Sequence, residues 1–190
     1  MARARTIHGL KPGGGVRTNA RKIVAERADE FFGFAPYLTD PTRVTELHDM
    51  RIAAKRLRYA LELFADALGP AAEGCIARIK EFQDLVGEIH DDDVFVGILR
   101  AHLAAIATER AALLADRAAH ADAPDGDAAL KAQCRALVTD DAWVAEQIAI
   151  AAAIARTSQT RRERHTTLIT QWQAREADEL HAQLGTLAAD

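Results

Sequence analysis

The stretch ELHDMRIAAKRLRYALELF, residues 46–64, decides the fold class and raises the question of function. When these residues are placed at 100° per residue, the apolar positions gather on one side of a helix. These core-facing positions are Leu47, Met50, Ala54, Leu57, Leu61 and Phe64. Basic side chains lie beside this apolar stripe. The pattern therefore predicts a helix that is buried on one side and basic along its edge.

The basic edge, which we call the basic strip, consists of His48, Arg51, Lys55, Arg58 and Tyr59, whereas Arg56 stands apart. Most charge runs on helices are solvated faces, and that interpretation stays open. A solvated face, however, usually mixes signs, while here Arg51–Lys55 and Lys55–Arg58 are like-charged neighbours that cost stability. Arginine binds phosphate oxygens in a bidentate way and lysine offers a point charge. The strip therefore suits a polyanion.

The composition of the whole chain predicts an all-α fold. Of its 190 residues 49% are hydrophobic but only 5% aromatic, and alanine, a strong helix former, dominates the apolar set. We expect an elongated antiparallel helical bundle of five to six helices. Residues 1–17 are predicted to be a flexible basic tail, because three consecutive glycines at 13–15 oppose a helix. Residues 18–188 are predicted to form one domain.

Glycine, proline and aspartate suggest where the helices begin and end. Helices are predicted over 18–34, 41–68, 70–87 and 91–120, with a loop at 121–127 and two more helices in 128–187. Asp40 and Pro41 predict an N-cap and a first helical position. Gly69 and Pro70 predict a helix stop. The break within 128–187 falls near 139–141 or near 157–158, and the sequence does not choose between them.

Charge and hydropathy limit the partners. Residues 1–60 hold 12 Lys or Arg against 6 Asp or Glu, whereas residues 61–190 hold 12 against 22, giving the net charge of −4. The first 15 residues lack the apolar core of a signal peptide, and the longest apolar run, 148–155, is too short to span a membrane. We expect a cytoplasmic protein without a membrane partner. The two cysteines lack metal-ligand spacing.

Two blocks of the sequence resemble a known family. Residues 46–64 and IKEFQDLVGEIHDDDVFVGIL, residues 79–99, are similar to the two signature blocks of the CHAD family, the conserved-histidine α-helical domains. The resemblance covers residues 18–100 and extends more loosely through RRERHTTLITQW, residues 161–172. It implies a non-catalytic helical bundle without a cofactor. Such a domain binds inorganic polyphosphate along a basic channel, sometimes at polyphosphate granules.

The resemblance also implies which residues bind. The positions of the family's basic helix are occupied by His48, Arg51, Lys55, Arg56, Arg58 and Tyr59. Lys80 matches the second block, and Arg161, Arg164 and His165 are weaker candidates on the late helix. Family domains usually repeat the basic helix in two halves, but this chain has one clear copy. We therefore expect a short form, and a homodimer that completes the channel is a hypothesis. The acidic signature of the triphosphatase domain that commonly accompanies the family is absent from the sequence.

Two other function classes remain open. The His-Asp pairs at 48–49 and 90–91 resemble those of metal-dependent HD phosphohydrolases, in which His48, His90 and Asp91 would hold a metal that activates water. The simpler interpretation is that acids at 91–93 oppose the positive end of a helix. The third class is a helical scaffold that binds an acidic protein or nucleic acid. The acidic balance of residues 61–190 disfavours nucleic acid.

Overall fold

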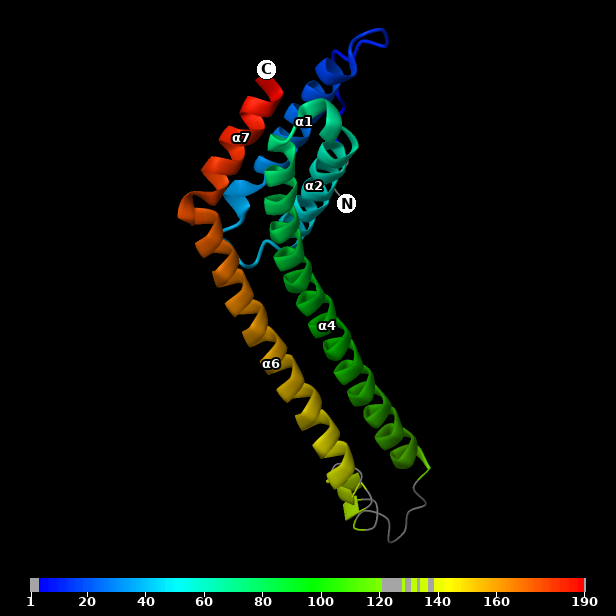
Figure 1. The fold of residues 1–190 in the computed structure, drawn as a ribbon. Helices are drawn as coiled ribbons and strands as arrows, with labels where there is room; N and C mark the ends of the chain where they lie inside the picture. The colour runs from blue at the N-terminus through cyan, green and yellow to red at the C-terminus, as the bar shows by residue number, and fades with distance from the viewer. Residues whose placement is uncertain (1–3, 121–127, 129–130, 133, 137–138, 190) are drawn as a thin grey trace. The chain divides into compact units, whose positions relative to one another are not determined.

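In the computed structural model, the residues that are described are 4–120, 128, 131–132, 134–136 and 139–189. Their regular elements are all helical, which confirms the all-α prediction (Figure 1). In chain order these are α1 (Val16–Phe32), the 3₁₀ turn η1 (Ala35–Tyr37), α2 (Val44–Leu63), α3 (Ala65–Leu68), α4 (Ala71–Ala119), α6 (Asp141–Gln171), the π-helical turn η2 (Trp172–Glu176) and α7 (Ala177–Ala189).

The chain divides into two compact units. The first comprises residues 1–91 and 161–190, and the second comprises residues 92–160. Within the first unit α1 packs against both α2 and α7 (Figure 1). The second unit contains the later part of α4 and the earlier part of α6. All residues that the sequence proposes for binding belong to the first unit.

The core of the first unit confirms the apolar stripe of α2. Leu47, Met50, Ala54, Leu57 and Leu61 are buried, and Phe64 packs against them at the edge of the core. Burial of one such large side chain contributes about 1.5–3 kcal/mol. Because the stripe faces inward, the basic strip of α2 is left beside the core.

Aromatic side chains join three helical segments of the same unit. The ring of Phe31 on α1 lies 5.1 Å from that of Phe82 on α4 and 5.7 Å from that of Trp172 on η2, between centroids. Both contacts are edge-to-face, which is a favourable arrangement for aromatic rings. These contacts fix the start of α4, which carries the groups opposite α2.

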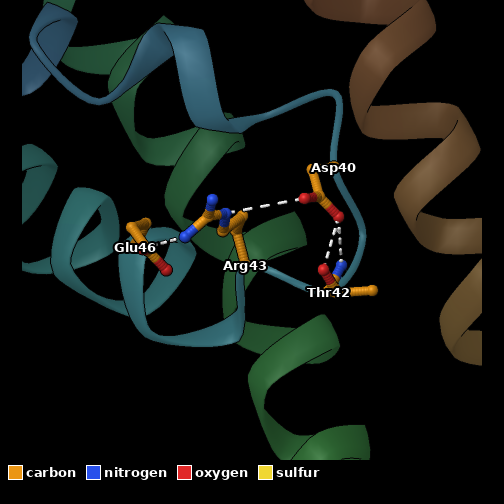
Figure 2. A network of polar contacts seen from close by, with 4 residues as sticks. All are labelled: Asp40, Thr42, Arg43 and Glu46. Carbon is orange, nitrogen blue, oxygen red and sulfur yellow. Dashed lines mark hydrogen bonds and ion pairs between the residues drawn. The ribbon is translucent and has the colours of Figure 1, made fainter.

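Helix α2 begins at Val44, so the prediction of a start at Pro41 with an Asp40 cap was wrong. The Asp40 carboxylate accepts hydrogen bonds from the Thr42 amide at 2.9 Å and the Thr42 hydroxyl at 2.6 Å, which closes a turn before the helix. Chiefly through the hydroxyl bond, Thr42 lowers the pKa of Asp40. Figure 2 shows Arg43 between Asp40 and Glu46, at 3.5 and 3.2 Å.

The predicted helix over 41–68 is also interrupted near its end. The backbone leaves helical geometry at Phe64, with φ −111° and ψ 15°. This interruption costs no hydrogen bond at Phe64, because its N–H bonds to the Ala60 carbonyl and its own carbonyl accepts from Leu68. Gly69 has φ +87°, a left-handed conformation that favours glycine, so the predicted stop at Gly69 is confirmed.

Helix α4 is one helix of 49 residues, so the predicted division into 70–87 and 91–120 was wrong. Gly87 does not end a helix: it lies within α4, outside the left-handed region, and is buried. The three aspartates at 91–93 consequently lie in the middle of α4 and not in a first turn. The loop predicted at 121–127 lies outside the described residues.

In the last third of the chain, the predicted break near 139–141 is confirmed and the alternative near 157–158 is wrong. Helix α6 starts at Asp141, and the Asp140 carboxylate caps it by accepting from the amides of Ala142 at 3.0 Å and Trp143 at 3.4 Å. The π-helical turn at 172–176 was not predicted. Part of the predicted basic tail is held by α1, where Asn19 exchanges two hydrogen bonds with the Lys11 backbone.

Candidate functional site

The basic strip of α2 faces α4 in an antiparallel register. His48 lies against His90, Arg51 against Gly87, and Arg58 against Gln83. Later residues of α2 therefore contact earlier residues of α4. On α4 these partners are three or four residues apart, so they share one face of the helix. Lys80 lies three residues before Gln83 and is therefore on this face, where it is exposed.

Arg51 lies directly on the backbone of α4. A Cβ atom at Gly87 would be 3.5 Å from Arg51 Nε and 3.8 Å from a terminal nitrogen, which is ordinary contact, so only a side chain larger than alanine would displace the guanidinium. Among the described residues no carboxylate lies within ion-pair distance of Arg51. The guanidinium is positioned by packing and keeps its hydrogen-bond donors for another acceptor.

Lys55 and Arg58 both lie within cation–π distance of the Tyr59 ring. Lys55 Nζ is 5.8 Å and the Arg58 guanidinium carbon is 5.0 Å from the ring centroid. At an exposed site such a cation–π contact contributes about 0.5–1 kcal/mol, and the Tyr59 side chain is 50% exposed. In the described part of the chain Lys55 has no acidic partner. The ring therefore orders two cations without neutralising them.

Arg58 is held more firmly than its neighbours. Its Nε donates to Gln83 Oε1 on α4 at 2.7 Å, and a terminal nitrogen donates to Glu62 Oε1 at 2.9 Å. The Glu62 pair is an i,i+4 ion pair near the surface, which contributes a few tenths of a kcal/mol. The charge of Arg58 is thus partly offset, while its orientation is fixed from both helices.

His48 lies at the end of the strip nearest His90. The two ring centroids are 4.7 Å apart, and His48 Nδ1 is buried without a hydrogen-bond partner. Burial lowers the pKa of His48 below its usual value, and the nearby His90 lowers it further, although Asp49 opposes these effects. His48 is therefore mainly neutral at pH 7, and an added anion at this place would favour its protonated form.

Arg56 lies away from the basic strip, toward α1. One of its terminal nitrogens is 2.5 Å from Glu30 Oε1, and Arg27 binds the other oxygen of the same carboxylate at 2.5 Å. Glu30 is only 3% exposed, so these two arginines balance a buried charge. Arg56 has a structural role at this contact. Its assignment to polyphosphate binding remains a prediction from the resemblance.

One of the candidates on the late helix, Arg164, also contacts α4. Arg164 Nε is 2.9 Å from Glu88 Oε2, and Glu88 follows Gly87 in the chain. Arg161 and His165 are 8% and 7% exposed, so they present little surface to a ligand. The structure thus places Arg164 against the same helix as the basic strip, while Arg161 and His165 offer little donor surface.

The metal alternative finds no support in the residues that are described. No group of three or more His, Cys, Asp or Glu side chains in this part of the chain could hold a metal ion. The described residues include 48–49 and 90–93, which carry the His-Asp pairs of that alternative. Within the described helices none is long and apolar enough to cross a membrane.

Sequence reasoning missed three supporting residues. Glu62 is not among them, because it lies four residues after Arg58 and helical spacing makes the two neighbours. Gln83 and Gly87 belong to the second resemblance block but acquire a role only once α4 lies against α2. Glu30 is 26 residues from Arg56, and no local pattern links them.

These features define a helical-bundle domain in which one helix presents cations without acidic partners beside the core. Residues 11–100 match the sequence model of the family described as the CHAD domain. The chain therefore carries a CHAD domain over these residues, as the two sequence blocks indicated. Neither the search of curated proteins nor that of solved structures gave a match.

Proposed function

We propose that this protein binds inorganic polyphosphate along the basic strip of α2, in a non-catalytic role. One observation carries the proposal: within a CHAD domain, Arg51 and Lys55 are adjacent on one helix edge and have no carboxylate partner among the described residues. Like charges at i,i+4 cost stability, so an arrangement that leaves them unpaired is expected to have an external anion as its counterpart.

The dimensions of the strip suit a linear anion. From His48 to Arg58 the helix rises about 15 Å, at about 1.5 Å per residue, which is long enough to meet several consecutive phosphates. The guanidinium of Arg51 is supported by α4, and Arg58 is oriented by Gln83, so less side-chain entropy is lost on binding. Lys80 would extend the strip at the Arg58 end.

A titration of the purified protein with long-chain polyphosphate at low and high salt tests the proposal. Binding should weaken steeply as salt rises, because each neutralised phosphate releases counterions. Single-stranded DNA of matched charge should bind more weakly, since the strip offers one tyrosine as a stacking surface. Equal affinity for the DNA would favour the scaffold alternative, and absence of polyphosphate binding would reject the proposal.

Two finer parts of the proposal concern assembly and location. A homodimer would supply a second basic strip, because the sequence contains one clear copy of the motif. Light scattering tests this directly: a monomeric mass of 20.7 kDa together with full binding activity would remove the dimer. A fluorescent fusion should coincide with polyphosphate granules, and lose this pattern when polyphosphate synthesis is blocked.

A further inference from the structure

The first unit contains a cavity lined in part by arginines, distinct from the basic strip. A cavity of about 460 Å³ opens between the start of α1, the start of α4 and the later part of α7. Its polar wall contains Arg17 and Arg21 from α1 and Gln183 from α7. Its apolar wall contains Leu68, Pro70 and Leu187. From Gly74, which also lines this cavity, to Gly87 the rise along α4 is about 20 Å, so the two places are well separated.

The polar groups that face this cavity are mainly unused donors. Arg17 and Arg21 make no ion pair in the described part of the chain, and Arg21 Nε is buried without a hydrogen-bond partner. The Gln183 carbonyl oxygen accepts from the Cys75 thiol at 3.8 Å, which leaves the amide nitrogen free to donate. The terminal nitrogens of Arg17 and Arg21 therefore keep their donors for a ligand that accepts hydrogen bonds.

The surrounding charge favours an anion. Residues 1–25 contain six Lys or Arg and no Asp or Glu. The acid nearest in sequence on α4, Glu73, is exposed and does not line the cavity. A cavity of this volume falls within the usual size range of small-molecule sites, and its apolar wall would accommodate a ring or carbon skeleton. Paired guanidinium groups are well suited to phosphate oxygens.

We infer that this cavity binds a small organic phosphate of about nucleotide size, with Arg17, Arg21 and Gln183 holding the phosphate. The apolar wall of Leu68, Pro70 and Leu187 holds the organic part. The site goes beyond the proposed binding of polyphosphate and does not depend on it, because it shares no residue with the basic strip.

Calorimetric titration of the full chain with magnesium-free ATP, used as the probe, tests this inference. One ATP should bind per chain, and Arg21→Ala and Arg17→Ala should each weaken binding at least tenfold. Inorganic tripolyphosphate should compete weakly, because it has nothing to place against the apolar wall. No saturable ATP binding, or tripolyphosphate affinity equal to that of ATP with the same dependence on Arg21, would overturn the inference.

Gly74 provides a variant that blocks the cavity without removing a contact. A Cβ at Gly74 meets nothing within 4 Å, so Gly74→Leu should fill the space, and replacing a helical glycine should not lower the melting temperature. Gly97→Leu is the matched control, since Gly97 lies on the same helix in the second unit and is equally open. ATP binding should be lost in the first variant and kept in the second. Undiminished binding by Gly74→Leu would refute the site.

The two sites can fail separately. Arg51→Ala/Lys55→Ala should keep ATP binding, while Arg21→Ala and Gly74→Leu should keep binding of long-chain polyphosphate. Loss of ATP binding in the Arg51→Ala/Lys55→Ala variant would mean that ATP uses the basic strip, and would refute the second site without affecting the proposed function.

Discussion

Replacing Arg51 and Lys55 by alanine together should separate binding from stability. Neither side chain has a carboxylate partner in the described part of the chain, so their removal breaks no ion pair there. Their mutual repulsion disappears, which is worth about 0.2–0.5 kcal/mol for an i,i+4 pair. Alanine is also the best helix former. Loss of the Lys55 contact with the Tyr59 ring, worth about 0.5–1 kcal/mol, offsets these gains, so we expect the free energy of unfolding to change by less than about 1 kcal/mol.

The same double substitution should weaken the binding of polyphosphate. Arg51 is partly shielded by α4, so a charged hydrogen bond from it contributes about 1.5–3 kcal/mol. Lys55 is exposed, and a screened contact there contributes only about 0.2–1 kcal/mol. Because a tenfold change in affinity corresponds to about 1.4 kcal/mol, the double variant should bind polyphosphate at least about 20-fold more weakly.

The salt dependence of binding provides an independent measure. For a single-chain polyanion each lost phosphate contact reduces the slope of log K against log salt by about 0.7, so two contacts reduce it by about 1.4. Titration at four salt concentrations, with chemical denaturation alongside, gives both quantities. Unchanged affinity and slope in a folded double variant would refute the assignment of the basic strip. A large loss of stability would refute the claim that these cations are unpaired.

Three further predictions follow from the same contacts. Arg56→Ala should destabilise the fold by about 1–3 kcal/mol in denaturant melts, because Glu30 stays buried with Arg27 alone. The same variant should leave the salt dependence of polyphosphate binding unchanged. A weaker salt dependence would mean that Arg56 contacts the ligand. Because burial lowers the pKa of His48, the contribution of this residue to stability is complete above about pH 6.5 and is lost as pH falls below that value. Polyphosphate affinity should rise over the same fall in pH. His90, Asp49 and Arg51 also act on the pKa of His48, and His48→Gln should flatten both pH profiles. Gly87→Ala should be tolerated, since its Cβ would meet Arg51 at an ordinary contact distance. Gly87→Leu, in contrast, should displace the Arg51 guanidinium and weaken polyphosphate binding at least tenfold. Equal polyphosphate affinities of the two variants would contradict this role of Gly87.

Composition was enough to predict the fold class, and periodicity was enough to predict the buried side of α2. The apolar stripe could be found because a helix that faces a core repeats every three to four residues, and the structure buries Leu47, Met50 and Leu57 as expected. Helix ends were predicted less well. Both Gly69 and Gly87 were predicted as helix stops. Gly69 has the left-handed backbone that ends a helix, whereas Gly87 does not. Composition alone does not distinguish a glycine that ends a helix from one that admits a neighbour.

The candidate site likewise has features that the sequence predicts and features that it does not. The basic strip is a property of one helix, so its members could be named from residues 46–64. Which cations are paired is a property of two or more helices and depends on contacts between residues far apart in the chain. Helical spacing already separates Arg56 from Arg51, but only the structure shows that Arg56 faces Glu30 on α1 and Arg51 faces Gly87 on α4.

The described acids that contact the basic groups account for which cations stay open. Glu30 holds Arg56, Glu62 holds Arg58, and Glu88 holds Arg164. In the described part of the chain none of these acids pairs with Arg51 or Lys55. The acids therefore orient Arg56, Arg58 and Arg164 and leave the charges of Arg51 and Lys55 available. A central acid would form an internal pair that a phosphate would first have to displace, so the placement of these carboxylates favours an anion-binding strip over an ordinary solvated face.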